Sequence, residues 1–262
     1  MSELPPIEEA IRAIATCLHT AKRVLFITGA GISADSGLPT YRGIGGLYED
    51  KETDEGFAIE DALSGEMLRR RPEITWKYVA QIERNCRNAG PNPAHFAIAR
   101  LERELPFALV LTQNIDGLHR AAGSENVLEI HGDLHKLRCV ACDWREQVGS
   151  FAHLDLPPVC PDCGGRVRPE VVFFGEMLPE AALERFLAEL DTGFDLVFSI
   201  GTTSVFPYIA QPVVEAIRAG VATVEINPGR THLSPHVRYR IPLGAAAALT
   251  KILEWRERLT GV

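Results

Sequence analysis

The chain has 262 residues, of which 46% are hydrophobic, as in an ordinary globular protein that forms one large domain or one domain with a sizeable insertion. Its 27 basic and 35 acidic residues give a net charge of −8, which argues against a general binder of nucleic acid or of anionic membranes. The acidic N-terminus lacks a signal-peptide pattern, and no apolar run reaches the ~18 residues of a membrane span. The six cysteines form two close pairs and two singletons, so we expect a cytoplasmic protein with reduced or metal-bound thiols.

The N-terminal part predicts a helix, a strand and a glycine turn in succession. Apolar residues at helical spacing predict a helix over Ile7 to Thr20, and the run Val24 to Thr28 predicts a buried strand. Gly29-Ala30-Gly31 would let the chain turn sharply and let phosphates approach the backbone, and Ile32-Ser33-Ala34 would open an anion-binding helix. An ordinary dinucleotide site needs an acidic residue about 20 positions further on, at the end of a second strand. That position is polar and without strand character, so an unusual nucleotide site and a tight structural turn remain equal alternatives.

The rest of the chain alternates between predicted helices and strands. Residues 43–88 are charged and contain a predicted helix over Met67 to Asn88, so we expect a helical insertion at the edge of a sheet. The alternation predicts the α/β class with a doubly wound, mostly parallel sheet. Further helices are expected at Ala94–Glu104, Pro179–Leu190, Gln211–Ala219 and Ala245–Leu259, and further strands at Phe107–Thr112, Val127–Ile130, Leu196–Ile200 and Ala222–Ile226.

Polar side chains follow two of these strands, at the edge where α/β sheets bind ligands. Asn114 and Asp116 would either hydrogen-bond a ribose or an amide or simply shape a turn. His131 is a candidate base, because an imidazole titrates near neutral pH. The rival histidines are His95, His119 and His135; a core or helix-start role is expected for the first of them.

Two C-x-x-C pairs give the strongest single signal. Cys139 and Cys142 are followed, after seventeen residues, by Cys160 and Cys163, the pattern of a tetrahedral four-cysteine zinc site. Four thiolates leave no open coordination position, so the zinc would be structural. Disulfides or chance pairs are the alternative, and so is a zinc ribbon that binds nucleic acid. Acidic and basic residues are mixed in this segment, so no basic face is evident.

Together, these motifs resemble those of the sirtuins, the NAD-dependent protein lysine deacylases, and they occur in the order found in that family. The resemblance runs from about Val24 to the final helix. The combination is highly specific, although no single motif would be. The segments that carry it are GAGISADSGLPTYRG, PNPAHFAIARLE, TQNIDGLH, LEIHG, the paired cysteine motifs, VVFFGE, GTTS and INPG.

The resemblance implies NAD as the cofactor, in an inverted relation to the sheet that needs no acidic ribose ligand. Tyr41 would lie over the nicotinamide ribose, and Arg42 would contact phosphate. The run Gln113 to Asp116 would hold the nicotinamide end, and residues from Gly201 onward the adenosine half. The residues implied in NAD binding are Gly29, Ala30, Gly31, Ile32, Tyr41, Arg42, Gln113, Asn114, Ile115, Asp116, Gly201, Thr202, Asn227, Gly244 and Ala245.

The same resemblance implies His131 and Asn114 as catalytic residues. The acyl-lysine carbonyl oxygen would attack C1′ of the nicotinamide ribose, and nicotinamide would leave. His131 would take a proton from the ribose hydroxyls, and free lysine and O-acyl-ADP-ribose would be released. Phe174, Gly175 and Glu176 would form one edge of the acyl-lysine cleft, where the substrate peptide adds as a strand.

Two departures from the family pattern concern the substrate site. GTTSVFP brings Pro207 early, which leaves the register of that loop open. Thr40 and FGEML resemble the branch that removes succinyl groups, which uses a Tyr-x-x-Arg pair. Here Tyr78 is followed by Gln81 where the arginine would stand, so we expect Tyr78 and Gln81 at the substrate and acetyl as the preferred acyl group. A desuccinylase, a mono-ADP-ribosyltransferase and a non-catalytic NAD-binding scaffold are the alternatives.

The resemblance also implies a division into domains. Residues 1–42, 89–136 and 169–262 would form a Rossmann-like NAD-binding domain. The helical insertion 43–88 and the zinc module 137–168 would together form a smaller domain. The expected partners are acyl-lysine-bearing substrate proteins, with neither nucleic acid nor membrane; the sequence does not determine the oligomeric state, and a monomer is compatible with it.

Overall fold

A six-stranded, all-parallel sheet organises the larger part of the molecule. The computed structural model describes residues 6–40 and 53–260. The strand order β3-β2-β1-β7-β8-β9 and the parallel pairing confirm the predicted α/β class with a doubly wound sheet. The strands are β1 (Arg23–Thr28), β2 (Phe107–Thr112), β3 (Val127–Glu129), β7 (Leu196–Ile200), β8 (Ala222–Ile226) and β9 (Tyr239–Ile241).

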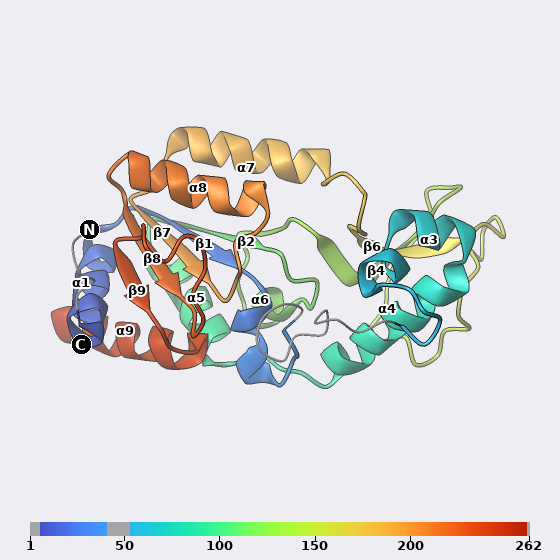
Figure 1. Cartoon of the computed structure of the whole chain (residues 1–262), viewed down its shortest axis with the longest axis horizontal. Helices are drawn as coiled ribbons and strands as arrows, with labels where there is room; N and C mark the ends of the chain where they lie inside the picture. Colours follow the sequence, from blue (N-terminus) through green and yellow to red (C-terminus); the bar gives the residue numbers. More distant parts are fainter. Residues whose placement is uncertain (1–5, 41–52, 261–262) are drawn as a thin grey trace.

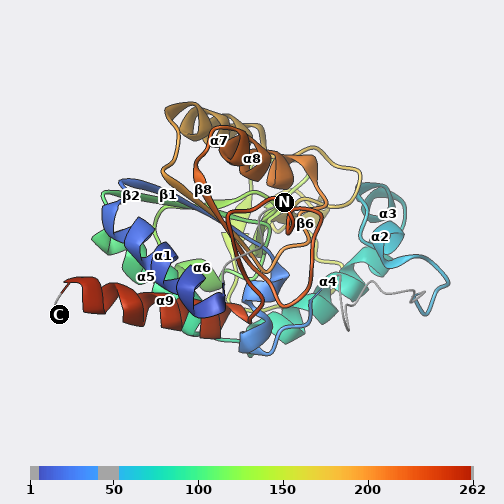
Figure 2. The ribbon, with the colours of Figure 1, turned by 60° about the vertical axis from the view of Figure 1, so that its left-hand side comes forward.

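Helices cover both faces of this main sheet, as Figures 1 and 2 show. Val24 and Phe26 of β1 belong to the core under α1, α5 and α9, whereas Leu25 and Ile27 belong to the core under α7 and α8. A strand buried on both faces needs apolar residues on both sides, which explains the unbroken apolar run Val24 to Ile27 within β1. The helices are α1 (Ile7–Thr20), α5 (Pro93–Glu104), α9 (Ala245–Thr260), α7 (Glu180–Thr192) and α8 (Pro207–Arg218).

A second group of elements lies away from the two chain ends (Figure 1). We call it the small lobe: residues 53–88 and 132–171, with an antiparallel sheet of order β5-β4-β6. It has its own apolar core, in which the rings of Trp76 and Phe151 lie 5.5 Å apart. Its elements are α2 (Ile59–Ala62), α3 (Gly65–Arg70), α4 (Pro72–Arg87), β4 (Gly132–Cys139), β5 (Arg145–Gln147) and β6 (Val167–Val171), and the short α6 (Leu118–Ala121) follows β2 of the main sheet.

The small antiparallel sheet extends beyond the predicted zinc module. Strand β4 begins at Gly132 and β6 ends at Val171, so both strands cross the boundaries expected at 137 and 168. The division into domains stays a prediction.

Several local predictions differ from the structure. The helix expected to open at Ile32 is wrong: the chain forms two short 3₁₀ turns, Ala30–Ile32 and Ala34–Ser36, and Gly37 ends the second with a φ of 82°. The helix predicted over 67–88 is divided, because a residue that precedes proline disfavours the helical conformation and Arg71 precedes Pro72. Helix α8 begins at Pro207, four residues before the predicted start at Gln211, because a proline fits the first helical position.

Within the described ranges, no helix combines the length and apolar character that a membrane crossing requires.

Candidate functional site

A cavity of about 810 Å³ lies between the main sheet and the small lobe. It opens at the carboxyl ends of β1 and β7, where the strand order changes direction and where α/β sheets bind ligands. Its volume lies within the range of ~300–1,000 Å³ that is usual for small-molecule sites. Residues that line it from the main sheet include Gly29, Gln113, His131, Gly201 and Asn227, and those from the small lobe include Leu63, Val79, Ile82, Leu134 and Val171.

Three glycines allow the turns after β1 and β7 to touch. The amide of Gly31 donates to the carbonyl of Gly201 at 2.8 Å, and the amide of Gly29 donates to Ile200 at 3.0 Å. A Cβ on Gly31 would lie 2.6 Å from the Gly201 Cα, and Gly201 itself has a φ of 59°. Backbone contact therefore requires these glycines, and the same turns, with Ala30, line the cavity.

The loop after β2 is held by hydrogen bonds to both neighbouring turns. Gln113 Nε2 donates to Thr202 Oγ1 at 2.9 Å, and Asn114 Nδ2 donates to the Gly29 carbonyl at 3.2 Å. Asp116 accepts from Ser33 Oγ at 2.7 Å, and burial raises the pKa of its carboxyl group. A smaller hollow beside the main cavity is lined by Ala30, Ser33, Asn114, Ile115 and Asp116.

His131 lies between β3 and β4, with both ring nitrogens in contact. Nδ1 lies 2.9 Å from the Gln113 carbonyl, and Nε2 lies 2.6 Å from the hydroxyl of Tyr208. Burial lowers the pKa of His131, and the hydrogen bond to the Gln113 carbonyl opposes that shift. The imidazole is therefore held neutral at physiological pH, the form that accepts a proton.

Gly132 directly follows His131 and starts β4. Its φ is 83°, and a Cβ there would lie 1.8 Å from the carbonyl oxygen of Glu170 on the paired strand β6. The carbonyl of His131 accepts from the amide of Val172 at 2.9 Å. His131 is therefore joined to β4 through the chain and to the segment that follows β6 through this hydrogen bond.

The rival histidines lie outside the cavity lining. His95 and His119 are both buried, with ring centroids 5.0 Å apart. Burial lowers the pKa of His95 to about 4 and that of His119 to about 3, so both are neutral in the folded protein. His95 accepts from the Asn92 amide at the start of α5, which matches the expected helix-start role. His135 lies on β4 in the small lobe.

The remaining NAD candidates flank the ends of β7, β8 and α9. Asn227 Nδ2 donates to the Thr202 carbonyl at 3.0 Å. Gly244 lines the cavity, and Ala245 is the first residue of α9. Asp35, which the sequence reasoning missed, also lines the cavity and accepts from the Ala246 amide at 3.1 Å. Tyr41 and Arg42 lie outside the described residues.

Phe174, Gly175 and Glu176 line the cavity from the segment after β6. Glu176 forms a two-pronged ion pair with Arg168, with N···O distances of 2.6 and 2.7 Å. That pair lowers the pKa of Glu176 against the effect of its burial. Sequence reasoning missed Arg168, although its position six residues before Phe174 in RPEVVFFGE offered a signal.

The structure does not bring Tyr78 and Gln81 to the cavity. The Tyr78 hydroxyl donates to Glu55 Oε2 at 2.6 Å, and Gln81 is exposed on α4. Val79 and Ile82, each one residue further along the helix, line the cavity instead. The expected placement is therefore wrong by one residue, because Trp76 and Tyr78 turn toward the core of the small lobe.

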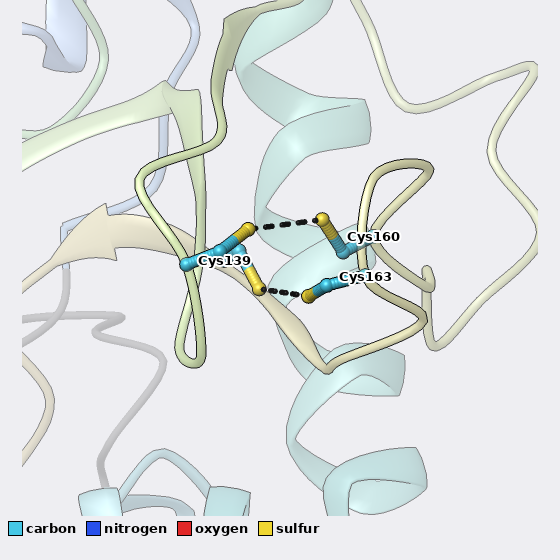
Figure 3. A group of neighbouring side chains, drawn as sticks. Cys139, Cys160 and Cys163 are labelled. Carbon is cyan, nitrogen blue, oxygen red and sulfur yellow. Dashed lines mark hydrogen bonds between the residues drawn. The ribbon is translucent and has the colours of Figure 1, made fainter.

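The four predicted zinc ligands converge in the small lobe. Figure 3 shows Cys139 facing Cys160 and Cys163 across a narrow gap. Cys139 and Cys163 have Sγ atoms 3.5 Å apart, Cys142 and Cys160 have Sγ atoms 3.6 Å apart, and all four sulfurs lie within 4.8 Å of one another. Zinc–sulfur bonds of ~2.3 Å place tetrahedral sulfurs ~3.8 Å apart, so this spacing fits zinc.

The backbone around the two C-x-x-C pairs supports the same assignment. The Ala141 amide donates to Cys139 Sγ at 3.3 Å, and this hydrogen bond, the largest cause, lowers the pKa of Cys139 to about 7. The Gly165 amide donates to Cys163 Sγ at 3.4 Å. Amides directed at sulfur favour the thiolate that binds metal. With four cysteine ligands the site is structural.

Comparison with known proteins gives close relatives over almost the full length. A protein from Pseudomonas syringae pv. tomato named NAD-dependent protein deacylase 2 is 52% identical over 242 residues, which cover 91% of this chain and 97% of that protein. A protein of the same name from Pseudomonas aeruginosa is 53% identical over 231 residues, which cover 87% of this chain and 90% of that protein.

Solved structures agree with these relatives. A mutant Sir2 homologue with ADP-ribose has a TM-score of 0.87 at 33% identity, covering 95% of this chain and 98% of the other. A Sir2 homologue with NAD has a TM-score of 0.86 at 33% identity, covering 99% and 98%. A triple mutant with 2′-O-acetyl-ADP-ribose has a TM-score of 0.84 at 34% identity, covering 95% and 97%. The Sir2 family model itself matches residues 29–207. With that match and these relatives, the chain belongs to the Sir2 family.

Proposed function

We propose that this chain, an NAD-dependent protein deacylase, removes acetyl groups from lysine side chains of substrate proteins. One observation carries the proposal: His131, held neutral, lies in the same cavity as the glycine turns after β1 and β7 and the apolar wall formed by α4 and Phe174. A nucleotide, a base and an uncharged acyl chain can therefore meet in one enclosed space. The relatives named as NAD-dependent protein deacylases support the same activity.

NAD, when bound, supplies the ribose that accepts the acyl group. We assign its nicotinamide end to the loop Gln113 to Asp116. Tyr41, as a partner of the nicotinamide ribose, and Arg42, as a partner of the phosphates, remain proposals from the resemblance. The turns at Gly29 and Gly201 would contact the phosphates and ribose, and Asn227 and the start of α9 the adenosine half. The close packing of these turns leaves backbone, rather than side chains, facing that part of the cavity.

His131 would take the proton that a ribose hydroxyl gives up. Its Nδ1–H donates to the Gln113 carbonyl, which leaves Nε2 as the acceptor on the side of Tyr208 and the cavity. Asn114 lies one residue beyond Gln113 and would hold the sugar in place. Phe174, Gly175 and Glu176 would form the edge along which the substrate peptide adds as a strand.

The acetyl preference follows from the wall that faces the acyl group. Leu63, Val79 and Ile82 are apolar, and they line the cavity from the small lobe. The charged side chains among the described lining residues, the histidine aside, are Asp35, Glu176 and Arg230. Arg230 follows the turn after β8 rather than lying on α4. A succinyl carboxylate would lose hydration at this wall without a cation to offset the loss.

Zinc would hold the small lobe and perform no chemistry. We propose that the insertion 43–88 and the module 137–168 act as one small domain that completes the cleft over the Rossmann-like domain. Reduced, metal-bound cysteines support a cytoplasmic location. The net charge of −8 supports protein substrates rather than nucleic acid. For the oligomeric state we propose a monomer.

The test is to mix the purified protein with NAD and an acetylated peptide and to follow nicotinamide, the acetyl group and the protein mass. A deacetylase releases nicotinamide and transfers the acetyl group in equal amounts. A mono-ADP-ribosyltransferase would release nicotinamide, leave the acetyl group on the peptide and add mass to a protein. A scaffold would bind NAD and release no nicotinamide. Either of the last two results would overturn the proposal.

A further inference from the structure

Tyr208, in the first turn of α8, contacts the histidine that the proposed function uses as a base. Pro207 occupies the first position of that helix, and this early proline places Tyr208 on the cavity wall. The phenol oxygen of Tyr208 lies 2.6 Å from His131 Nε2. Burial raises the pKa of Tyr208 to about 12, so the hydroxyl keeps its proton at any working pH.

The direction of this hydrogen bond follows from the other side of the ring. The Gln113 carbonyl, 2.9 Å from Nδ1, can only accept, so Nδ1 carries the hydrogen. In the neutral imidazole Nε2 then has a free lone pair. The Tyr208 hydroxyl must therefore donate to Nε2.

Aromatic packing fixes the positions of both rings. Phe206 and Tyr208 are stacked, with centroids 5.5 Å apart and planes 15° apart. Each meets the His131 ring edge-on, at 6.2 Å for Phe206 and 5.9 Å for Tyr208. The imidazole is thus held by one hydrogen bond at each nitrogen and by two rings beside it.

We propose that Tyr208 is a positioning residue for His131, and that its hydroxyl keeps Nε2 unprotonated and turned into the cavity until a ribose hydroxyl replaces it. This inference rests on the proposed function of His131 as the base. A donor to Nε2 stabilises the neutral imidazole and competes with protonation. Tyr208 therefore extends the activity to lower pH.

Charged groups near the cavity do not give the same effect. Burial and the Gln113 carbonyl account for the shift of the His131 pKa, without a contribution from a charged side chain among the described residues. From the β6 side Glu176 is paired with Arg168, and from the β2 side Asp116 accepts from Ser33 and Leu118. Asp35 and Arg230 line the cavity near α9 and β8.

The test is a titration of the free protein labelled with ¹⁵N-histidine, with the His131 signal assigned by its loss in His131→Asn. Tyr208→Phe keeps the ring and removes the hydroxyl. We expect the His131 pKa to rise by about half a unit to one unit, a roughly three- to tenfold change in its protonation equilibrium. The acidic limb of kcat/KM should move up by the same amount, with kcat/KM at high pH within about threefold of the wild type. Tyr239→Phe, a buried tyrosine outside the cavity lining, is the matched control.

An unchanged His131 pKa in a folded Tyr208→Phe protein would overturn the inference. The wild-type spectrum provides a second test that needs no variant. If Nε2 rather than Nδ1 carries the hydrogen in the neutral ring, Tyr208 cannot donate to it. Because both measurements use the free protein, they decide the role of Tyr208 even if the deacetylation assay fails.

Discussion

Replacing Val79 by arginine should change which acyl group the cavity accepts. Val79 is 2% exposed and lines the cavity from α4, beside Ile82. An arginine at this position can extend its guanidinium group into the cavity while its aliphatic stem stays on the apolar wall. Gln81 lies two residues further along the same helix, where it is exposed and absent from the cavity lining. Gln81→Arg is therefore the matched control.

The expected change in kcat/KM follows from the apolar character of the wall, which offers a carboxylate no positive charge. In the wild type we expect acetyl-lysine to exceed succinyl-lysine by at least ~10-fold in kcat/KM, or ~1.4 kcal/mol. A hydrogen bond to a charged partner contributes ~1.5–3 kcal/mol, and an arginine fork can make two to one carboxylate. Part of this gain is offset by burying the guanidinium group. Val79→Arg should therefore raise desuccinylation by ~10-fold or more and lower deacetylation, while Gln81→Arg leaves both rates near the wild type.

The assay compares kcat/KM for one peptide that carries either acyl group, with thermal unfolding as the control for folding. If Gln81→Arg rather than Val79→Arg reduced the difference in kcat/KM between the two acyl groups, Gln81 rather than Val79 would face the cavity, and the orientation of α4 described above would be wrong. Equal or faster desuccinylation by the wild type would refute the argument from the apolar wall, and another cation would have to read the carboxylate.

Three further predictions concern the base, the zinc and the buried histidines. His131→Ala should keep NAD binding, measured by calorimetry, and lose ~10²–10⁴ in turnover, the usual cost of a lost general base; near-normal turnover would move the role elsewhere. Cys142→Ser or strong chelation should unfold or aggregate the protein, because structural zinc contributes ~10–16 kcal/mol in small modules; purified protein without stoichiometric zinc would contradict this. The pKa values of His95 and His119 are lowered to about 4 and 3, so their contribution to stability is present above pH ~6.5 and is lost as pH falls toward those values. Urea unfolding at pH 5 should show ~4 kcal/mol less stability than at pH 7.5, and an unchanged value would mean that these rings are not neutral and buried.

The parts of the site that depend on strand ends could be predicted from the sequence. Val24 to Ile27 is apolar throughout, and the glycine turn after β1, the loop at Gln113 and His131 follow predicted strands. The carboxyl ends of parallel strands share one edge, so these residues meet whatever the details of packing. The cysteine pairs were predictable for a similar reason, since each pair needs only one local turn to present two sulfurs.

The parts that depend on tertiary packing could not be predicted. Which face of α4 meets the cavity is decided by Trp76 and Tyr78 in the core of the small lobe, and the sequence around Val79 fits either rotation. The contact of Tyr208 with His131 joins residues 77 positions apart. Strand β9 has three residues, too few for a periodic pattern, and it exists because β8 offers a parallel edge.

The path of β4 and β6 gives the cysteine cluster a consequence beyond stability. Strand β4 starts beside His131 and ends at Cys139, while β6 starts four residues after Cys163 and leads to Phe174. The cluster thus ties together the far ends of two paired strands whose near ends carry His131, the proposed base, and Phe174, part of the proposed substrate edge. Metal loss or thiol oxidation would release the far ends of β4 and β6 and let the two strands move apart. The spacing of His131 and Phe174 would change as a result, so the cluster sets the alignment of these two residues from the opposite end of the lobe.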